Sequence, residues 1–158
     1  MDIFNGLTAI LSAGLAWILF SERHGQSGFP GQIALIAALV GAIIVVIGSV
    51  LVILGIKGWY LAGLYMATGN ALIGLWVLQL SYATLRDNNL THSLVILGII
   101  SGLIMLLGLA TIPGIINAID SWDSAPWYVN YIGQAGALGW LILYPIWCVL
   151  LGRAFLLK

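Results

Sequence analysis

Two histidines are the side chains with the clearest potential for metal or cofactor chemistry. His24 lies in the polar stretch SERHGQSGFPG, and His92 begins an apolar segment. A pair of imidazoles can hold a haem or a metal ion, so His24 and His92 are candidate ligands. Neither has a Cys, Asp or Glu at ligand spacing except Glu22, two residues before His24. We therefore interpret both as histidines of polar turns, and we predict no metal site.

The motifs of common enzyme classes are missing from the chain. The sequence contains no HExxH, no GxSxG, no CxxC and no phosphate loop of the Walker type. Asp120 and Asp123 are three residues apart and could form a carboxylate pair, but solvated acids of a loop are the preferred interpretation. Cys148 lies in an apolar run and is interpreted as a packing residue. We predict no catalytic residue and a non-enzymatic protein.

The composition places the chain in a lipid bilayer. Of the 158 residues, 62% are hydrophobic and 6% are charged, whereas soluble domains carry roughly 25% charged residues. So few charges do not cover a soluble surface of this size, whereas a lipid-facing surface needs none. The formal net charge is zero, which gives no electrostatic reason to expect a nucleic-acid partner.

Five apolar segments have the length of about 20 residues that a membrane-spanning helix needs. We predict a single all-α transmembrane domain, residues 1–158, with an outer loop at 113–130. The alternative is four spans, with the short first segment lying in the membrane interface. Within the outer loop, the spacing of Ile115, Ile119 and Trp122 fits a short surface helix, and an irregular loop is the other interpretation. The predicted spans cover residues 3–20, 32–56, 59–85, 92–112 and 131–155.

The basic residues predict an orientation. With five spans, Arg23, Arg86, Arg153 and Lys158 share the side of the C-terminus, and Lys57 lies on the other side. Positively charged residues favour the cytoplasmic side of a membrane. We therefore predict that the N-terminus is outside and the C-terminus inside.

Small residues recur on the faces of the predicted helices. Such residues let helix backbones approach closely in lipid, where hydrophobicity does little to drive helices together. We interpret these positions as internal helix packing; a homo-oligomer seam and a partner-binding groove are the alternatives. The predicted packing glycines are Gly41, Gly48, Gly55, Gly63, Gly74, Gly98 and Gly102.

The last span carries a stripe of glycines followed by aromatic residues, comprising Gly133, Gly136, Trp140, Tyr144 and Trp147. The aromatic rings either fill space between splayed helices or bind a hydrophobic ligand such as a lipid tail, quinone, carotenoid or tetrapyrrole. No cofactor is predicted beyond these possibilities. The nearby proline in the sequence YPIW predicts a kink, because proline lacks a backbone donor.

Polar residues inside the spans are few. No Asp, Glu, Lys or Arg falls at a predicted midplane, which is evidence against an ion-coupled pump. Asn70 lies near the middle of the third span, where it would either bond to another helix or contact a polar ligand group. A stripe of Asn70 and Ser81 facing Gln134 across a shared axis would favour a small oligomeric transporter or channel.

Three stretches, GNALIGLWVLQLSY, LGIISGLIMLLGLATIPG and LYPIWCVLLGRAFL, resemble small multi-span bacterial membrane proteins of unknown function. The last stretch carries the pattern of Pro145, Trp147, Gly152 and Arg153. The resemblance covers about the C-terminal two thirds of the chain. It implies a bacterial protein, and hence the cytoplasmic (inner) membrane, and it transfers no functional residue.

These observations lead to three functional hypotheses. The first is a non-enzymatic protein that works by binding, either as an accessory or structural subunit of a membrane complex or as a binder of a hydrophobic ligand. Its partners would be the bilayer and other membrane subunits, or further copies of itself. The second is the small oligomeric transporter or channel. The third is a redox subunit with a cofactor held by His24 and His92.

Overall fold

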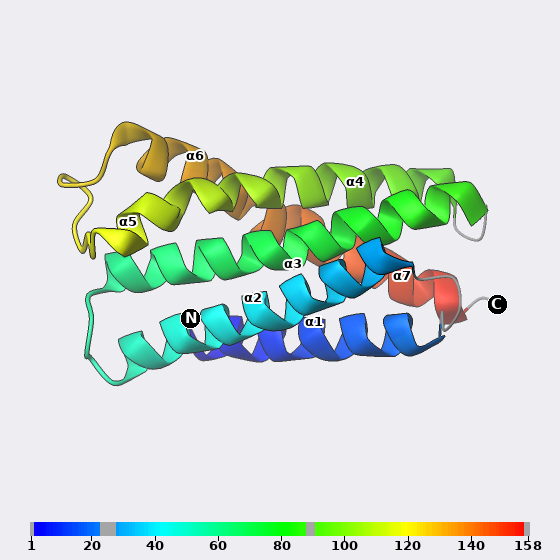
Figure 1. Cartoon of the computed structure of the whole chain (residues 1–158), viewed down its shortest axis with the longest axis horizontal. Helices are drawn as coiled ribbons and strands as arrows, with labels where there is room; N and C mark the ends of the chain where they lie inside the picture. The colour runs from blue at the N-terminus through cyan, green and yellow to red at the C-terminus, as the bar shows by residue number, and fades with distance from the viewer. Residues whose placement is uncertain (1, 23–27, 88–90, 157–158) are drawn as a thin grey trace.

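The structure is a computed structural model that describes residues 2–22, 28–87 and 91–156. All secondary structure in these ranges is helical. Five helical passes are long and apolar enough to cross a membrane. Successive passes alternate in direction along the long axis (Figure 1). The first three are α1 (Asp2–Glu22), α2 (Phe29–Ile53) and α3 (Trp59–Asp87).

The fourth and fifth passes each change helical type along their length. The fourth consists of α4 (His92–Leu106), the 3₁₀ segment η1 (Leu107–Thr111) and α5 (Ile112–Ile116). The fifth consists of α6 (Trp127–Leu138), the π-helical segment η2 (Gly139–Leu143) and α7 (Tyr144–Leu156).

Several predicted boundaries differ from the structure, and the largest differences are at both ends of the second pass, which ends at Ile53 instead of 56, at the end of the fourth and at the start of the fifth. The second pass begins at residue 29 instead of 32, because Pro30 lies in the first turn of the helix, where its missing N–H costs nothing. The fourth pass continues to residue 116, and the fifth begins at residue 127. The predicted loop 113–130 therefore shrinks to residues 117–126.

Of the two interpretations of the outer loop, the structure supports the irregular loop, and the short surface helix through Ile119 and Trp122 is not formed. α5 ends at Ile116, and Ala118 adopts a left-handed backbone conformation with a φ of 48°. The backbone N–H of Ile119 then turns back to the carbonyl of Gly114, at 2.9 Å. This geometry is a common way to end a helix, so the following residues form an irregular loop.

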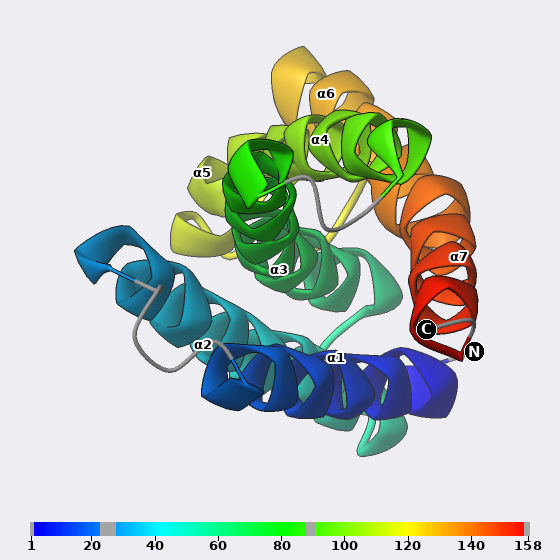
Figure 2. The ribbon, with the colours of Figure 1, turned by 90° about the vertical axis from the view of Figure 1, so that its right-hand side faces the viewer.

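Helix α3 is the centre of the bundle. In its most apolar window, 67% of the residues are buried, compared with 22–39% in the other four passes. Figure 2 looks along the bundle and shows α3 surrounded by α1 and α2 on one side and by α4 and α7 on the others. Large apolar side chains such as Ile36, Ile43 and Val149 are exposed on the outer helices. Lipid is the solvent that such a surface requires.

Glycines bring the backbones of neighbouring helices together. An added Cβ at Gly102 of α4 would lie 2.7 Å from the carbonyl oxygen of Gly74 in α3. One at Gly48 of α2 would lie 3.0 Å from the carbonyl oxygen of Ala62 in α3, and Gly41 lies against the backbone of Gly69. The shared small-residue faces therefore position α2 and α4 against α3.

Two of the predicted packing glycines have other roles. Gly55 lies beyond the end of α2 and has a φ of 63°, so it turns the chain after the helix instead of packing within it. A Cβ added at Gly63 would meet no described atom within 4 Å, so this glycine borders open space. Gly98 does pack, against Ser81 of α3 and the indole of Trp147.

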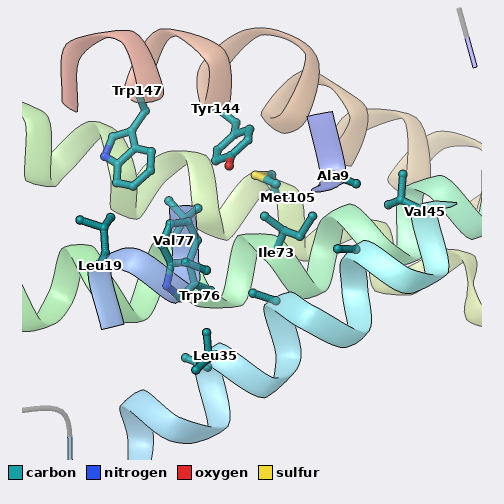
Figure 3. Close-up of a cluster of buried hydrophobic side chains, with 14 of the residues drawn as sticks. Ala9, Leu19, Leu35, Val45, Ile73, Trp76, Val77, Met105, Tyr144 and Trp147 are labelled. Carbon is teal, nitrogen blue, oxygen red and sulfur yellow. The ribbon is translucent and has the colours of Figure 1, made fainter. Parts of the chain in front are cut away.

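Buried aromatic rings fill the interior between α3, α7 and α1 (Figure 3). The ring of Trp147, 1% exposed, stacks on Tyr144 and meets Trp76 edge-on, each at a centroid distance of 6.1 Å. The Tyr144 hydroxyl donates a hydrogen bond to Ser12 Oγ of α1, at 2.7 Å. This contact ties the last pass to the first.

Candidate ligand-binding pocket

A pocket of about 190 Å³ lies between α3 and the fifth pass, at the end of the bundle where α3 and α6 begin. We call it the α3–α6 pocket. Its wall is mostly apolar and aromatic. Its lining residues are Trp59, Tyr60, Gly63, Leu64, Ala67, Thr111, Trp122, Val129, Asn130, Gly133, Gln134, Ala137 and Trp140.

Small residues create the space. Gly63 and Ala67 are four residues apart on α3, and Gly133 and Ala137 are four apart on α6, so each pair lies on one helix face. Nothing occupies the position where a Gly63 side chain would stand. Gly133 is tighter, because an added Cβ would lie 2.5 Å from the Thr111 methyl group. The pocket therefore has room on the α3 side.

The π-helical segment η2 interrupts the fifth pass at the residue that lines the pocket, Trp140. Gly139 begins the π-helical segment, and a Cβ there would lie 2.8 Å from the backbone nitrogen of Met105. The N–H of Tyr144 bonds the carbonyl of Gly139 in the wider π-helical register. Pro145 follows and has no N–H to donate, which favours a local break. Trp140, which lines the pocket, is the second residue of this segment.

The Asn130 side chain makes two hydrogen bonds at one end of the pocket wall. Its side chain is buried, accepts a hydrogen bond from the Tyr60 hydroxyl, and donates one to the Trp122 carbonyl at 3.1 Å. The Tyr60 and Trp122 rings meet edge-on at a centroid distance of 6.1 Å. One carboxamide thus joins α6, α3 and the loop 117–126.

The loop 117–126 is also tied to the start of α3 through Asp120. The carboxylate accepts hydrogen bonds from the N–H groups of Gly58, at 2.7 Å, and Leu61, at 3.1 Å. These N–H groups at the beginning of α3 have no partner within the helix, and the helix dipole favours a negative charge there. Asp120 therefore has a structural role as a cap supplied from a distant segment, and the loop acids do not form a pair of equivalent solvated groups.

The hydroxyl group of Thr111, a residue that lines the pocket, is buried and hydrogen-bonded. Thr111 Oγ1 lies 2.8 Å from Thr68 Oγ1 and 2.6 Å from the carbonyl oxygen of Gly108. These bonds satisfy polar groups that would be costly in an apolar interior.

The indole nitrogen of Trp140 is set back from the pocket. Trp140 Nε1 is buried and makes no hydrogen bond within the described part of the chain. Because protein atoms enclose this nitrogen, it does not face the open space of the pocket, and the part of Trp140 that lines the pocket is apolar ring surface.

The predicted ligand face is divided by the structure. Gly133 and Trp140 line the pocket, whereas Tyr144 and Trp147 belong to the interior aromatic cluster. Gly136 packs against the backbone of η1, where a Cβ would lie 2.7 Å from the nitrogen of Gly108.

The structure also shows where Asn70, Ser81 and Gln134, the residues of the predicted polar stripe, lie. Asn70 is buried on α3 but does not line the pocket. The proposed polar stripe is not assembled within one chain, since Ser81 is buried against Gly98 and Gln134 lines the pocket instead.

The first-loop histidine, His24, lies outside the described residues, so the pair with His92 is not placed. His92 is exposed at the start of α4. Among the residues that the structure describes, no group of three or more His, Cys, Asp or Glu side chains could hold a metal ion.

Sequence reasoning missed most of the pocket. In the predicted layout, Trp59 and Tyr60 begin the third span, whereas Trp122 and Asn130 lie in the outer loop 113–130, so the sequence does not bring them together. One pattern in the sequence does indicate the earlier start of the fifth pass. The residues from Trp127 to Ala137 have an apolar periodicity that continues the fifth span towards the N-terminus.

Comparisons with known proteins give no relative for this chain. No family model, no curated protein and no solved structure matches it.

Proposed function

We propose that the protein is a non-enzymatic, multi-pass membrane protein that binds a hydrophobic ligand in the α3–α6 pocket. The observation that carries the proposal is the cavity itself, of about 190 Å³, bordered by glycines and aromatic rings. An apolar cavity of about 150 Å³ is large enough to bind benzene. A space of this kind is a natural binding site for an apolar group.

The size of the pocket restricts the ligand. Sites that enclose a drug-sized molecule have volumes of about 300–1,000 Å³, so this pocket holds only part of such a molecule. A ring or a short length of chain fits, and the remainder of the ligand has to extend into the surrounding lipid. Among the ligands considered from the sequence, a tetrapyrrole macrocycle is too large to be enclosed.

We further propose five membrane spans, with the N-terminus outside and the C-terminus in the cytoplasm of a bacterium. The distribution of Lys and Arg supports this orientation. It puts the pocket end of the bundle near the outer surface of the cytoplasmic membrane. In a chain carrying Cys148→Ser, a cysteine at Asp123 should react with an impermeant maleimide added to intact cells, and one at Thr91 should react only after permeabilisation. The opposite pattern contradicts the orientation.

Native mass spectrometry tests the binding function. The wild type should leave the membrane with a hydrophobic molecule bound in a fixed ratio, and Gly63→Leu should lose it because the new side chain fills the pocket. Gly14→Leu is the matched control, because Gly14 is also an exposed helical glycine with no described atom within 4 Å of an added Cβ. Equal retention by both variants contradicts the proposal. Copurification of other membrane subunits, with no small molecule bound, would support the accessory-subunit hypothesis instead.

A further inference from the structure

We propose that the outer half of the fifth pass is a hinged arm that opens and closes the α3–α6 pocket. The outer arm consists of the loop 117–126 and α6. Its hinge is the π-helical segment η2, and contacts at its far end hold it against α3. The hinge can be tested without a ligand, whereas its use as an entrance to the pocket rests on the proposed binding function.

The backbone of the fifth pass is irregular at η2. The N–H of Tyr144 bonds the carbonyl of Gly139, five residues back, and the next residue, Pro145, has no N–H to continue this register. In an α-helix the same N–H would bond the carbonyl of Trp140 instead. Tyr144 makes one such bond in either register, so η2 can change its form without losing it. Helices bend at π-helical turns and at prolines.

The fourth pass is irregular at the same level of the bundle. Its 3₁₀ segment η1 interrupts the pass, and a 3₁₀ stretch within a helix often marks a hinge. A Cβ added at Gly136 would lie 2.7 Å from the backbone nitrogen of Gly108. One added at Gly139 would lie 2.8 Å from the backbone nitrogen of Met105. The two backbones therefore meet where both leave the α-helical form, and this contact is a suitable pivot.

The arm contacts α3 mainly near its outer end. The pocket lies between the middle of α6 and α3, and α6 packs chiefly against η1. At the outer end, Val129 of α6 packs with Leu61 and Leu64 of α3 in a small apolar cluster that is separate from the main core. This cluster can part without disturbing the main core.

Polar contacts also join the outer end of the arm to α3. The Tyr60 hydroxyl donates a hydrogen bond to the Asn130 side chain. The Asp120 carboxylate accepts hydrogen bonds from the N–H groups of Gly58 and Leu61. These contacts lie at the opposite end of α6 from η2. Breaking them should therefore release the arm while its pivot stays in place.

A small change at the hinge is enough to open the pocket. Helix α6 has 12 residues, which at about 1.5 Å per residue make a lever of about 18 Å. A change of about 20° at η2, comparable to a helix kink, moves the far end of this lever by about 6 Å. Such a displacement would open the pocket to the surrounding lipid between α3 and α6.

Pulsed electron paramagnetic resonance of spin-labelled protein in nanodiscs measures this motion. All chains carry Cys148→Ser. The outer pair of labels is on Ile53→Cys at the end of α2 and Trp127→Cys at the start of α6. The inner pair, on Phe29→Cys and Phe155→Cys, lies on the same two passes at the opposite end of the bundle. All four positions are exposed, so the labels do not enter the core.

The contact variant combines Tyr60→Phe with Asp120→Ala. Its control combines Tyr82→Phe with Asp123→Ala, two exposed positions. One hydrogen bond between membrane helices is worth about a factor of three in an equilibrium, so the contact variant should raise the ratio of open to closed arm by about tenfold or more. We expect a second population of the outer distance, displaced by about 6 Å. The inner distance and both distances of the control should match the wild type.

Pro145→Ala tests the hinge itself. The substitution restores the missing N–H and favours a regular, stiffer helix. Added to the contact variant, it should reduce the second population of the outer distance. If that population is unchanged, η2 is not the pivot and the inference is wrong.

Two further outcomes would overturn the inference. If the outer distance is the same in the wild type and the contact variant, the arm does not open. If the inner distance broadens together with the outer one, the whole bundle loosens and there is no hinge. Ligand retention by the wild type and Gly63→Leu judges the binding function separately, so either proposal can fail while the other stands.

Discussion

Replacing Gly102 with alanine should weaken the contact between α3 and α4. The new Cβ would lie 2.7 Å from the carbonyl oxygen of Gly74 and 2.9 Å from the backbone nitrogen of Leu78. Ordinary contact begins at 3.4 Å, so the carbonyl oxygen has to withdraw by about 0.7 Å, which is 3.4 Å less 2.7 Å. Because both neighbours are backbone atoms, no side-chain rotation relieves the clash, and the two helices have to separate.

The magnitude follows from two opposing effects. Forcing an extra methyl group into a packed interface costs about 1–3 kcal/mol, and exchanging glycine for alanine in a helix gains up to about 1 kcal/mol. Gly14→Ala shows the helical gain alone, because nothing described lies within 4 Å of its Cβ position. We therefore expect Gly102→Ala to be about 1–3 kcal/mol less stable than Gly14→Ala.

Unfolding in mixed micelles of dodecyl maltoside and sodium dodecyl sulfate provides the measurement, with helical circular dichroism as the readout. The comparison of the two variants in the same detergent series removes the common change in helix propensity. If Gly102→Ala is as stable as Gly14→Ala, then α3 and α4 do not approach as closely as described, and the small-residue explanation of the bundle is refuted.

Three further substitutions test other contacts by the same unfolding assay. Asp120→Ala should cost about 0.5–2 kcal/mol, because two N–H groups at the start of α3 lose their acceptor. Asp123→Ala on the same loop is the control, and an equal effect of both would show that the cap is unimportant. Tyr144→Phe should cost about 0.6 kcal/mol, the average for hydrogen bonds between membrane helices. The exposed Tyr82 offers the matched Phe control, and a loss no larger than that control's would count against the α1–α7 bond. Trp147→Ala should cost about 3–5 kcal/mol by leaving a cavity, and a loss below 1 kcal/mol would mean that the aromatic cluster collapses around it.

The helical passes were largely predictable, because their number and approximate positions depend on length and hydrophobicity alone. The small-residue faces were predictable for a similar reason, since Gly41, Gly74 and Gly102 occupy positions where a close approach is the simplest use of glycine in lipid. The start of the fifth pass was placed too late. Residues Trp127 and Asn130 were assigned to the loop by their polar or amphipathic character, and the structure buries Asn130 through contacts with distant segments.

The sequence alone could not show which of these residues border a pocket. Gly63 and Gly74 are both glycines on the same helix, and only the position of neighbouring helices decides that one borders a cavity and the other a backbone. The π-helical segment is a further example. Pro145 predicted a distortion, but its form and its effect on Trp140 depend on how α6 packs against η1. Asp120 likewise acquires its role from a residue partner 62 positions away.

A high-resolution density map of the protein in lipid nanodiscs tests the central claim most directly, because it shows whether the α3–α6 pocket is occupied. The account predicts non-protein density beside Gly63 that continues out of the pocket into the lipid. A pocket closed by its own side chains, with no density beside Gly63, would contradict the account.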